Sequence, residues 1–303
     1  MALHIQPIYE EFAAEVGGID LSKPLEKEEW TQIDEAFLKY GVLVFPGQKL
    51  EADQHLTFAK TFGPLEDSVG YFIPKDAKLR IDQRLSDISN MTLDGQIWGK
   101  DSLERTFHLA NKLWHTDSTF HKVPARISML YGLSVAPVGG QTEYADMRAA
   151  YDALPDDLKK RVENLVAEHS ILHSRDAAGF EAPPAELRKL FPSVPQVLVR
   201  HNERSGRNAL YLASHAGSIL GMPQDEGKAL LKELTAHAPQ RQFCYLHRWR
   251  PNDLVMWDNR CTMHRARSYD DLAHPRDLRR ATVSDEIPSC ERQGVAVPEA
   301  VAA

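Results

Sequence analysis

The 303-residue sequence has little cysteine, no long hydrophobic run and no dense block of basic residues. Its three cysteines, Cys244, Cys261 and Cys290, lack the spacing of a metal site or a disulfide framework, which favours a reducing compartment. No run of 18 apolar residues occurs, and no basic segment followed by an apolar one begins the chain, so we expect neither a membrane span nor a signal peptide. A net charge of −7 without basic clusters disfavours nucleic acid and anionic membranes as partners. These absences together predict a cytoplasmic protein.

What is present is the composition of a globular protein, 43% hydrophobic and 26% charged. Helical spacing of apolar residues predicts helices at 26–41, 51–63, 223–238 and, divided at Pro155, within 146–166. Short apolar or alternating runs predict strands at 42–45, 125–135, 167–174, 197–201, 208–214 and 278–284, and a hairpin formed by 243–249 and 254–259. Many short strands without regular strand–helix alternation predict a mainly β fold with inserted helices around a double-stranded β-helix, a cupin-like jelly roll.

No repeat or linker divides the sequence, so we expect one jelly-roll domain over residues 1–287. Residues 64–110 show no sustained period apart from a possible strand at 85–89, and so long a loop indicates a functional segment such as a lid. Within it, Tyr71, Phe72 and Ile73 are candidates for closing over a ligand or for plain packing. Residues 288–303 have no period, and we expect a mobile C-terminal tail.

The run LWHTDSTF, residues 113–120, places His115 and Asp117 two positions apart. On a strand, residues i and i+2 point to the same face, so both side chains can reach one point. Imidazole and carboxylate are ligands for a divalent first-row metal. The pair alone is weak evidence, because ordinary polar residues on a half-buried strand have the same pattern.

A third ligand has to come from elsewhere in the chain. His169 and His173 would lie roughly 13 Å apart on a strand that rises about 3.3 Å per residue, too far to share a metal. His264, in WDNRCTMHRA, follows a predicted strand and precedes several arginines, including Arg276 and Arg280. Two histidines and one carboxylate leave coordination positions open, the pattern of non-haem Fe(II) oxygenases, and arginine is the preferred partner of a cosubstrate carboxylate. Without the histidines, the arginines would be a solvated basic edge.

Four motifs in order, WHTDSTF, GGQTEYADMRAAYDALP, LVMWDNRCTMHRA and RDLRRAT, resemble the taurine dioxygenase family of Fe(II)- and 2-oxoglutarate-dependent oxygenases. The resemblance extends from about residues 16–21 to 279–283. It implies that Fe(II) is held by His115, Asp117 and His264. It also implies that Thr142 and Arg276 bind 2-oxoglutarate. The spacing from His264 to Arg276 is one residue longer than the family pattern, which leaves Arg279 as an alternative to Arg276.

For the primary substrate, the resemblance implies that Arg280 holds the acidic group and that Asn111 lies beside the substrate. His215 falls in a segment that shapes the pocket in relatives, with a simple loop histidine as the alternative. The closest branch of the family implies hydroxylation of the carbon next to the carboxylate of an aryloxyalkanoate such as 2,4-dichlorophenoxyacetate. The products would be a phenol and glyoxylate, formed while 2-oxoglutarate and O2 give succinate and CO2.

Two other functions stay open from the sequence. The same chemistry could act on a taurine-like sulfonate or another natural carboxylate. From a different class, a jelly roll with two histidines and an aspartate could bind zinc and serve as a hydrolase or a small-molecule binding module. We also expect a homo-oligomer.

Overall fold

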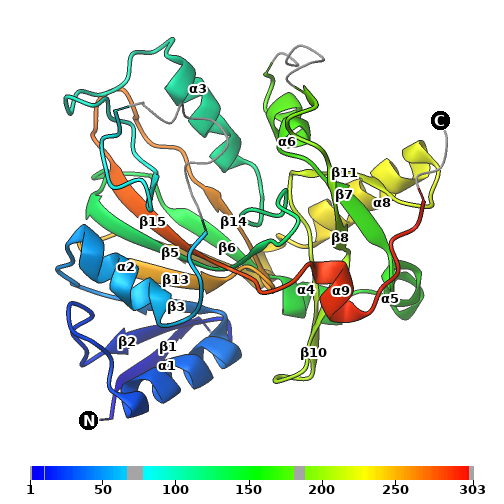
Figure 1. Ribbon diagram of the computed structural model, residues 1–303, viewed down its shortest axis with the longest axis horizontal. Coiled ribbons are helices and arrows are strands. Elements are labelled where there is room, and N and C mark those ends of the chain that lie inside the picture. Colours follow the sequence, from blue (N-terminus) through cyan, green and yellow to red (C-terminus); the bar gives the residue numbers. More distant parts are fainter. Residues whose placement is uncertain (1, 10, 67–77, 181–187, 300–303) are drawn as a thin grey trace.

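A computed structural model describes residues 2–9, 11–66, 78–180 and 188–299 (Figure 1). Two sheets form its core. The larger sheet has the spatial order β1 (His4–Tyr9), β2 (Ala13–Gly17), β3 (Val42–Phe45), β13 (Leu254–Asp258), β5 (Ala125–Ser134), β15 (Asp277–Ser284), β4 (Ser86–Asp87). The smaller sheet has the order β12 (Cys244–His247), β6 (Thr142–Asp146), β14 (Thr262–Ala266). Neighbouring strands are antiparallel except for β2 and β3.

Helices and shorter strands surround this core. The helices are α1 (Lys27–Tyr40), α2 (Ala52–Lys60), α3 (Leu103–His108), α4 (Met147–Asp152), α5 (Asp156–Val162), α6 (Ile171–Ala177), α8 (Gln224–His237) and α9 (Ser289–Gln293), with 3-10 turns at Leu109–Lys112 and Arg241–Phe243. The additional strands are β11 (Ala216–Ile219), β7 (Val166–His169) and β8 (Val194–Val197) in one sheet and β9 (Val199–Asn202) and β10 (Arg207–Leu210) in another. In Figure 1, α3 and α6 lie at the same end of the molecule.

The continuously apolar strand β3 shows how the layers are packed. Val42 and Val44 belong to a buried cluster with Tyr144 of the smaller sheet, whereas Leu43 and Phe45 belong to a cluster with the apolar faces of α1 and α2. Because successive side chains alternate between the two faces of a strand, an apolar residue is needed at every position. The larger sheet is therefore covered by helices on one face and by the smaller sheet on the other.

The mainly β, jelly-roll prediction is confirmed, and most predicted elements are present within a residue or two of their expected bounds. Helix α1 ends where Gly41 adopts a left-handed φ of 70° and its N–H donates to Phe37 O at 2.9 Å. Strand β4 lies inside the predicted 85–89 segment. The helices predicted on either side of Pro155 are α4 and α5.

Three local predictions are wrong. Residues 243–249 and 254–259 form no hairpin, because β12 pairs with β6 whereas β13 pairs with β3 and β5 of the other sheet. The predicted strand at 167–174 ends at His169, and Ser170 then caps α6 by accepting a hydrogen bond from Leu172 N–H. The run at 113–120 is no regular strand: His115 forms an isolated bridge, and a turn follows it. Beyond these, the C-terminal segment after residue 287, expected to be a mobile tail, has an element that no periodicity predicted.

That C-terminal segment contains α9, in which Ser289 and Cys290 are buried. The side chain of Ser289 accepts a hydrogen bond from Val197 N–H, so the helix is attached to β8. Its apolar residues are too few to give a period, which explains why the sequence pattern missed it. The lid candidates Tyr71, Phe72 and Ile73 lie outside the described residues. No helix in the described parts of the chain is long and apolar enough to cross a membrane.

Candidate active site

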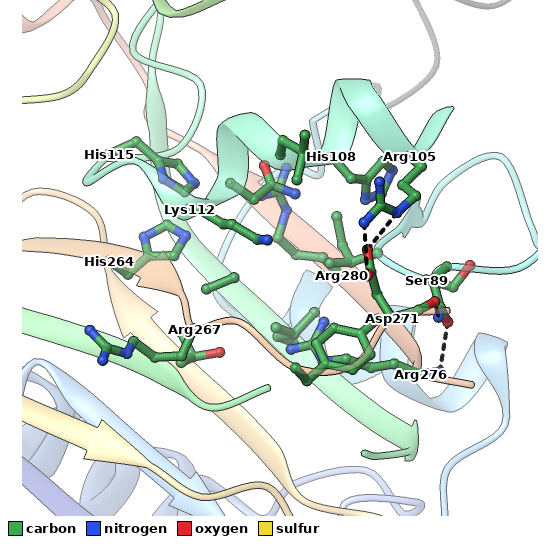
Figure 2. A pocket seen from close by; sticks show the side chains of 18 of the residues that line it. Ser89, Arg105, His108, Lys112, His115, His264, Arg267, Asp271, Arg276 and Arg280 are labelled. Carbon is green, nitrogen blue, oxygen red and sulfur yellow. Dashed lines mark hydrogen bonds and ion pairs between the residues drawn. The ribbon is translucent and has the colours of Figure 1, made fainter. Parts of the chain in front are cut away.

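His115 and His264 come together through the backbone of two distant segments. His115 N–H donates to His264 O at 3.0 Å, and His264 N–H donates to His115 O at 2.8 Å. Their rings point into the same space, with centroids 4.2 Å apart (Figure 2). The carboxylate of Asp117 lies 3.9 Å from His115 Nε2 and 3.7 Å from His264 Nε2. One ligand atom from each of the three residues lies within 4.8 Å of the others, so a single metal ion could bind all three.

The turn that follows His115 takes the place of the predicted strand. Ser118 adopts a left-handed φ of 52°, which bends the chain directly after Asp117. The neighbours of the pair still point away from the site. Trp114 lies under the Arg265 guanidinium at 4.6 Å, and Thr116 Oγ1 donates to Leu212 O at 2.8 Å. The histidine and the aspartate therefore share a side as predicted, although only one of them makes a β-type pairing.

The protonation states of the three residues suit a divalent cation. Burial lowers the pKa of His264 to about 3 and also lowers the pKa of His115, so both rings are neutral at pH 7. Burial would raise the pKa of Asp117, but the Arg280 guanidinium and the hydrogen bond from Ser128 lower it, and the carboxyl group stays ionised. His115 Nδ1–H donates to Leu113 O at 2.8 Å, which leaves the Nε2 lone pair free to bind a metal. Neutral imidazole and carboxylate donors fit a first-row metal.

A hydrogen-bonded network that the sequence did not reveal holds the carboxylate of Asp117. Ser128 Oγ donates to Asp117 Oδ2 at 2.7 Å, and Asn259 Nδ2 donates to Ser128 Oγ at 2.9 Å. Asn259 Oδ1 in turn accepts from Trp257 Nε1 at 3.1 Å and from the Asp117 N–H at 3.3 Å. Asn259 thus has a structural role, since it orients Ser128 and the backbone of Asp117. Ser128 lies in an ordinary strand sequence and gives no signal of its role.

The C-terminal helix also supports this turn, through Gln196 of β8. Gln196 Nε2 donates to Thr119 O at 2.9 Å and to His121 O at 2.8 Å, two carbonyls of the turn that follows Asp117. Ser289 Oγ of α9 donates to Gln196 Oε1 and so fixes the orientation of that amide. Gln196 and Ser289 are fully buried. A single buried amide thus connects α9 to the turn.

An inner pocket of about 100 Å³ extends from the two histidines to Arg276 (Figure 2). Thr142, the second predicted 2-oxoglutarate contact, lines it and accepts a hydrogen bond from Trp249 Nε1 at 3.0 Å. Arg276 is only 7% exposed, and its Nη2 donates to Gly140 O at 3.3 Å. It has no carboxylate partner among the described residues, and burial lowers its pKa. A buried cation without a counter-ion marks a place for an anionic ligand.

Strand register decides between Arg276 and Arg279. Arg280 lies opposite Leu130, which is buried between the two sheets, whereas Arg279 lies opposite Tyr131, which packs with the helices on the other face. Directly paired residues in antiparallel strands point to the same side of the sheet. Arg280 therefore points into the jelly roll and Arg279 away from it. Arg276 and Arg280 line the inner pocket, and Arg279 does not.

A larger outer chamber of about 1070 Å³ shares His115, Asn111 and Arg280 with the inner pocket. Its wall is mainly apolar and aromatic, and includes Leu79, Ile81, Met91, Trp98, Phe107 and Phe120. His215 also lines this chamber, and its Nδ1 lies 3.1 Å from Thr119 Oγ1. Burial lowers the pKa of His215 well below its ordinary value, so it is a neutral polar group in the wall. All eight site residues predicted from the sequence thus line one of two connected spaces or lie between them.

Arg280 differs from its predicted position in one respect. Its guanidinium contacts the carboxylate of Asp117 instead of facing an empty space. The predicted substrate-binding arginine is therefore also the counter-charge of a metal-ligand candidate. Because Arg280 borders both cavities, it could keep this contact and still present its remaining N–H groups to a bound molecule.

Comparison with known proteins agrees with this geometry. A family model described as "Taurine catabolism dioxygenase TauD, TfdA family" matches residues 4–282. The chain belongs to this family. Among its relatives, the alpha-ketoglutarate-dependent 2,4-dichlorophenoxyacetate dioxygenase of Cupriavidus pinatubonensis is 45% identical over 94% of this chain and 99% of its own. The (S)-phenoxypropionate/alpha-ketoglutarate-dioxygenase of Sphingobium herbicidovorans is 36% identical over 89% of this chain and 91% of its own.

A solved structure supports the same family assignment. The crystal structure of AAD-2 in complex with Mn(II) and N-oxalylglycine superposes with a TM-score of 0.91 and 46% sequence identity, covering 95% of this chain and 100% of that one. The high TM-score over nearly the whole chain means that the two proteins share both sheets, and not only the metal motif.

Proposed function

We propose that this protein is an Fe(II)- and 2-oxoglutarate-dependent dioxygenase that hydroxylates the carbon next to the carboxylate of an aryloxyalkanoate such as 2,4-dichlorophenoxyacetate. One observation carries the reaction class: the three ligand atoms of His115, Asp117 and His264 converge beside the buried, unpaired Arg276. The aryloxyalkanoate substrate is supported by relatives named for such substrates that match nearly the whole chain.

Two sets of residues would hold the reactive groups. His115, Asp117 and His264 would hold Fe(II), and Thr142 and Arg276 would hold 2-oxoglutarate, the arginine by paired hydrogen bonds to the distal carboxylate. When bound, iron and 2-oxoglutarate supply the chemistry that activates O2 and oxidises a C–H bond, with succinate and CO2 as coproducts.

The chain's own contribution is to position the reactants and exclude water. Ser128 holds the Asp117 carboxylate in one orientation, and Arg280 compensates its charge. Arg280 and Asn111 lie where the two cavities meet, next to the histidines, and would hold the substrate so that the carbon beside its carboxylate faces the metal. The apolar wall of the outer chamber, with His215, would enclose the ring. The hydroxylated product is a hemiacetal, which separates into a phenol and glyoxylate.

Anaerobic addition of 2-oxoglutarate to the Fe(II) protein tests the reaction class. A weak visible charge-transfer band should appear, because the keto acid would chelate ferrous iron. A zinc-binding hydrolase or binding module would give no such band. The buried Arg276 favours the keto acid, since neither alternative needs a cation at that place.

A substrate panel then tests the substrate class. Succinate release should be coupled to aryloxyacetates or aryloxypropionates much more strongly than to taurine or simple alkyl carboxylates. Preferential turnover of taurine would keep the reaction class and contradict the aryloxyalkanoate assignment.

Four further expectations from the sequence stay predictions: a single domain over residues 1–287, a lid within 64–110, a homo-oligomer and a cytoplasmic location. The structure neither divides the chain nor shows a partner. Light scattering of the purified protein would determine its assembly, and limited proteolysis with and without substrate would locate a lid.

A further inference from the structure

Arginines line both cavities, and most of those in the described residues are paired with carboxylates. The pairs are Arg80 with Asp87 and Asp277, Arg105 with Asp271, Arg267 with Glu143, and Arg280 with Asp117. Across the described parts of the chain, two cavity-lining arginines have no carboxylate partner: Arg276 in the inner pocket and Arg175 in the outer chamber. The first already has a proposed ligand. The second does not.

Arg175 lies on α6 in an environment that costs free energy unless an anion is present. Its Nε is buried and has no hydrogen-bond partner, and burial lowers the pKa of the guanidinium to about 10. The guanidinium carbon lies 3.8 Å from the centre of the Phe107 ring on α3. A cation–π contact of this kind offsets part of the desolvation cost and holds the guanidinium plane against the ring, but it satisfies none of the N–H donors.

The position of Arg175 relates it to the metal site. It borders the same chamber as His115, Asp117 and Arg280. Because Arg280 already contacts Asp117, an anion entering this chamber finds in Arg175 a cation that no carboxylate has neutralised.

We propose that Arg175 is an anion-binding residue of the outer chamber that, with Arg280, holds the carboxylate of the primary substrate. The proposal rests on the proposed function and adds a second, uncompensated cation to the substrate site. Phe107 leaves the edge of the Arg175 guanidinium available for paired hydrogen bonds to a carboxylate. The aromatic and apolar wall around it would contact the rest of an aryloxyalkanoate.

Two variants and a control test this role. In Arg175→Gln the charge is removed, and in Arg175→Lys it is kept without the forked donors. Arg161→Gln is the control. It removes an exposed arginine of α5 that pairs with Glu226 and lines neither cavity. Calorimetric titration of the anaerobic Fe(II)–2-oxoglutarate protein would measure the binding of phenoxyacetate and of its neutral analogue phenoxyacetamide.

We expect Arg175→Gln to weaken phenoxyacetate binding about 10- to 100-fold, the effect of losing hydrogen bonds to a charged group. Binding of phenoxyacetamide and of 2-oxoglutarate should stay within about twofold. The phenoxyacetate affinity of Arg175→Lys should lie between those of Arg175→Gln and the wild type. The affinity of Arg161→Gln should equal that of the wild type. An equal loss for the acid and the amide, or no loss for either, would overturn the proposal and leave Arg175 as a packing residue.

A parallel titration with taurine separates this proposal from the proposed function. If the wild type binds and oxidises taurine instead of phenoxyacetate, the aryloxyalkanoate assignment fails. Arg175 would then still be confirmed by a tenfold weaker binding of taurine to Arg175→Gln. If the charge-transfer band forms but neither anion binds the wild type, the Arg175 proposal fails while the reaction class stands.

Discussion

The inner pocket and the outer chamber meet at the same histidine but are built from different kinds of structure. The inner pocket is bordered on one side by paired strands, and Trp257, one of its lining residues, lies on β13, in which every residue is buried. Its other side is bordered by residues between 88 and 112. Much of the outer chamber is bordered by the segment from 78 to 110, and α3 within it has no buried residue. The difference indicates that the reactive groups are fixed by the sheets, whereas substrate selectivity depends on segments that can vary without disturbing the core.

The largest effect is expected from the metal candidates of the inner pocket. Replacing His115 or Asp117 with alanine should abolish the formation of succinate coupled to substrate, because each substitution removes a proposed ligand. The measurement is succinate released per substrate consumed, with the iron content of each variant determined alongside. Coupled turnover at a wild-type rate in either variant would mean that the ligand set is misassigned.

Substitutions of Arg276 and Arg280 should affect the KM values of different ligands, because the two arginines are proposed to bind 2-oxoglutarate and the primary substrate respectively. Arg276→Gln should raise the KM for 2-oxoglutarate, and Arg280→Gln the KM for the primary substrate, each by about 10- to 100-fold. Arg279→Gln, on the opposite face of β15, is the matched control and should change neither constant by more than about twofold. Because Arg280 also contacts Asp117, the metal content of its variant has to be measured first. Equal changes in both constants would contradict the division into two sites.

A smaller effect is expected when the metal-ligand candidate Asp117 is kept and only the side chain that holds its carboxylate is changed. Ser128→Ala deletes the hydroxyl that donates to Asp117 Oδ2 and should weaken metal binding roughly 10-fold, as is usual for such supporting groups. Ser134→Ala is the control, because its hydroxyl only bonds to a backbone oxygen at 3.4 Å at the end of the same strand. Competition with a chelator would give both affinities. Unchanged affinity in Ser128→Ala would mean that the pocket tolerates a mobile carboxylate.

The smallest effect on activity should come from the helix-covered face, outside both cavities, where a buried histidine affects stability instead. Burial lowers the pKa of His55 on α2 to about 4, so the unfolded chain binds a proton below pH 6.5 that the folded chain does not. Stability therefore falls as pH decreases from about 6.5 towards 4, by up to ~1.4 kcal/mol per pH unit for this residue. Urea unfolding at pH 7, 6 and 5 should show a shallower loss for His55→Leu than for the wild type. An equal loss of stability with pH in His55→Leu and the wild type would contradict a lowered pKa of His55.

The sequence predicted the inner pocket better than the outer chamber, for physical reasons. His115, Asp117, His264, Thr142 and Arg276 lie in compact sequence motifs, so each can be found without knowledge of the fold. The turn after Asp117 was mistaken for part of a strand because the metal pair was interpreted as strand alternation, although Asp and Ser are common in turns. The positive φ of Ser118 shows the bend. The prediction that the side chains of His115 and Asp117 point to the same side of the segment is still correct.

Residues that act through long-range contacts could not be predicted. Trp249 reaches Thr142 from 107 positions away, and Arg175 meets Phe107 only because α6 and α3 fold to the same end of the molecule. The false hairpin has the same origin: β12 and β13 are neighbours in sequence but belong to different sheets. Periodicity describes which face of an element is buried, and it carries no information on the partner that buries it.

The helix at the C-terminal end has a consequence for how this protein can be shortened or fused. Ser289 orients Gln196, and Gln196 holds the carbonyls of Thr119 and His121 just beyond the metal turn. A chain cut after residue 287 would lose that support, although no catalytic motif would be missing. Iron retention is therefore expected to suffer from C-terminal trimming, whereas a fusion after residue 299 would leave α9 and its contacts in place.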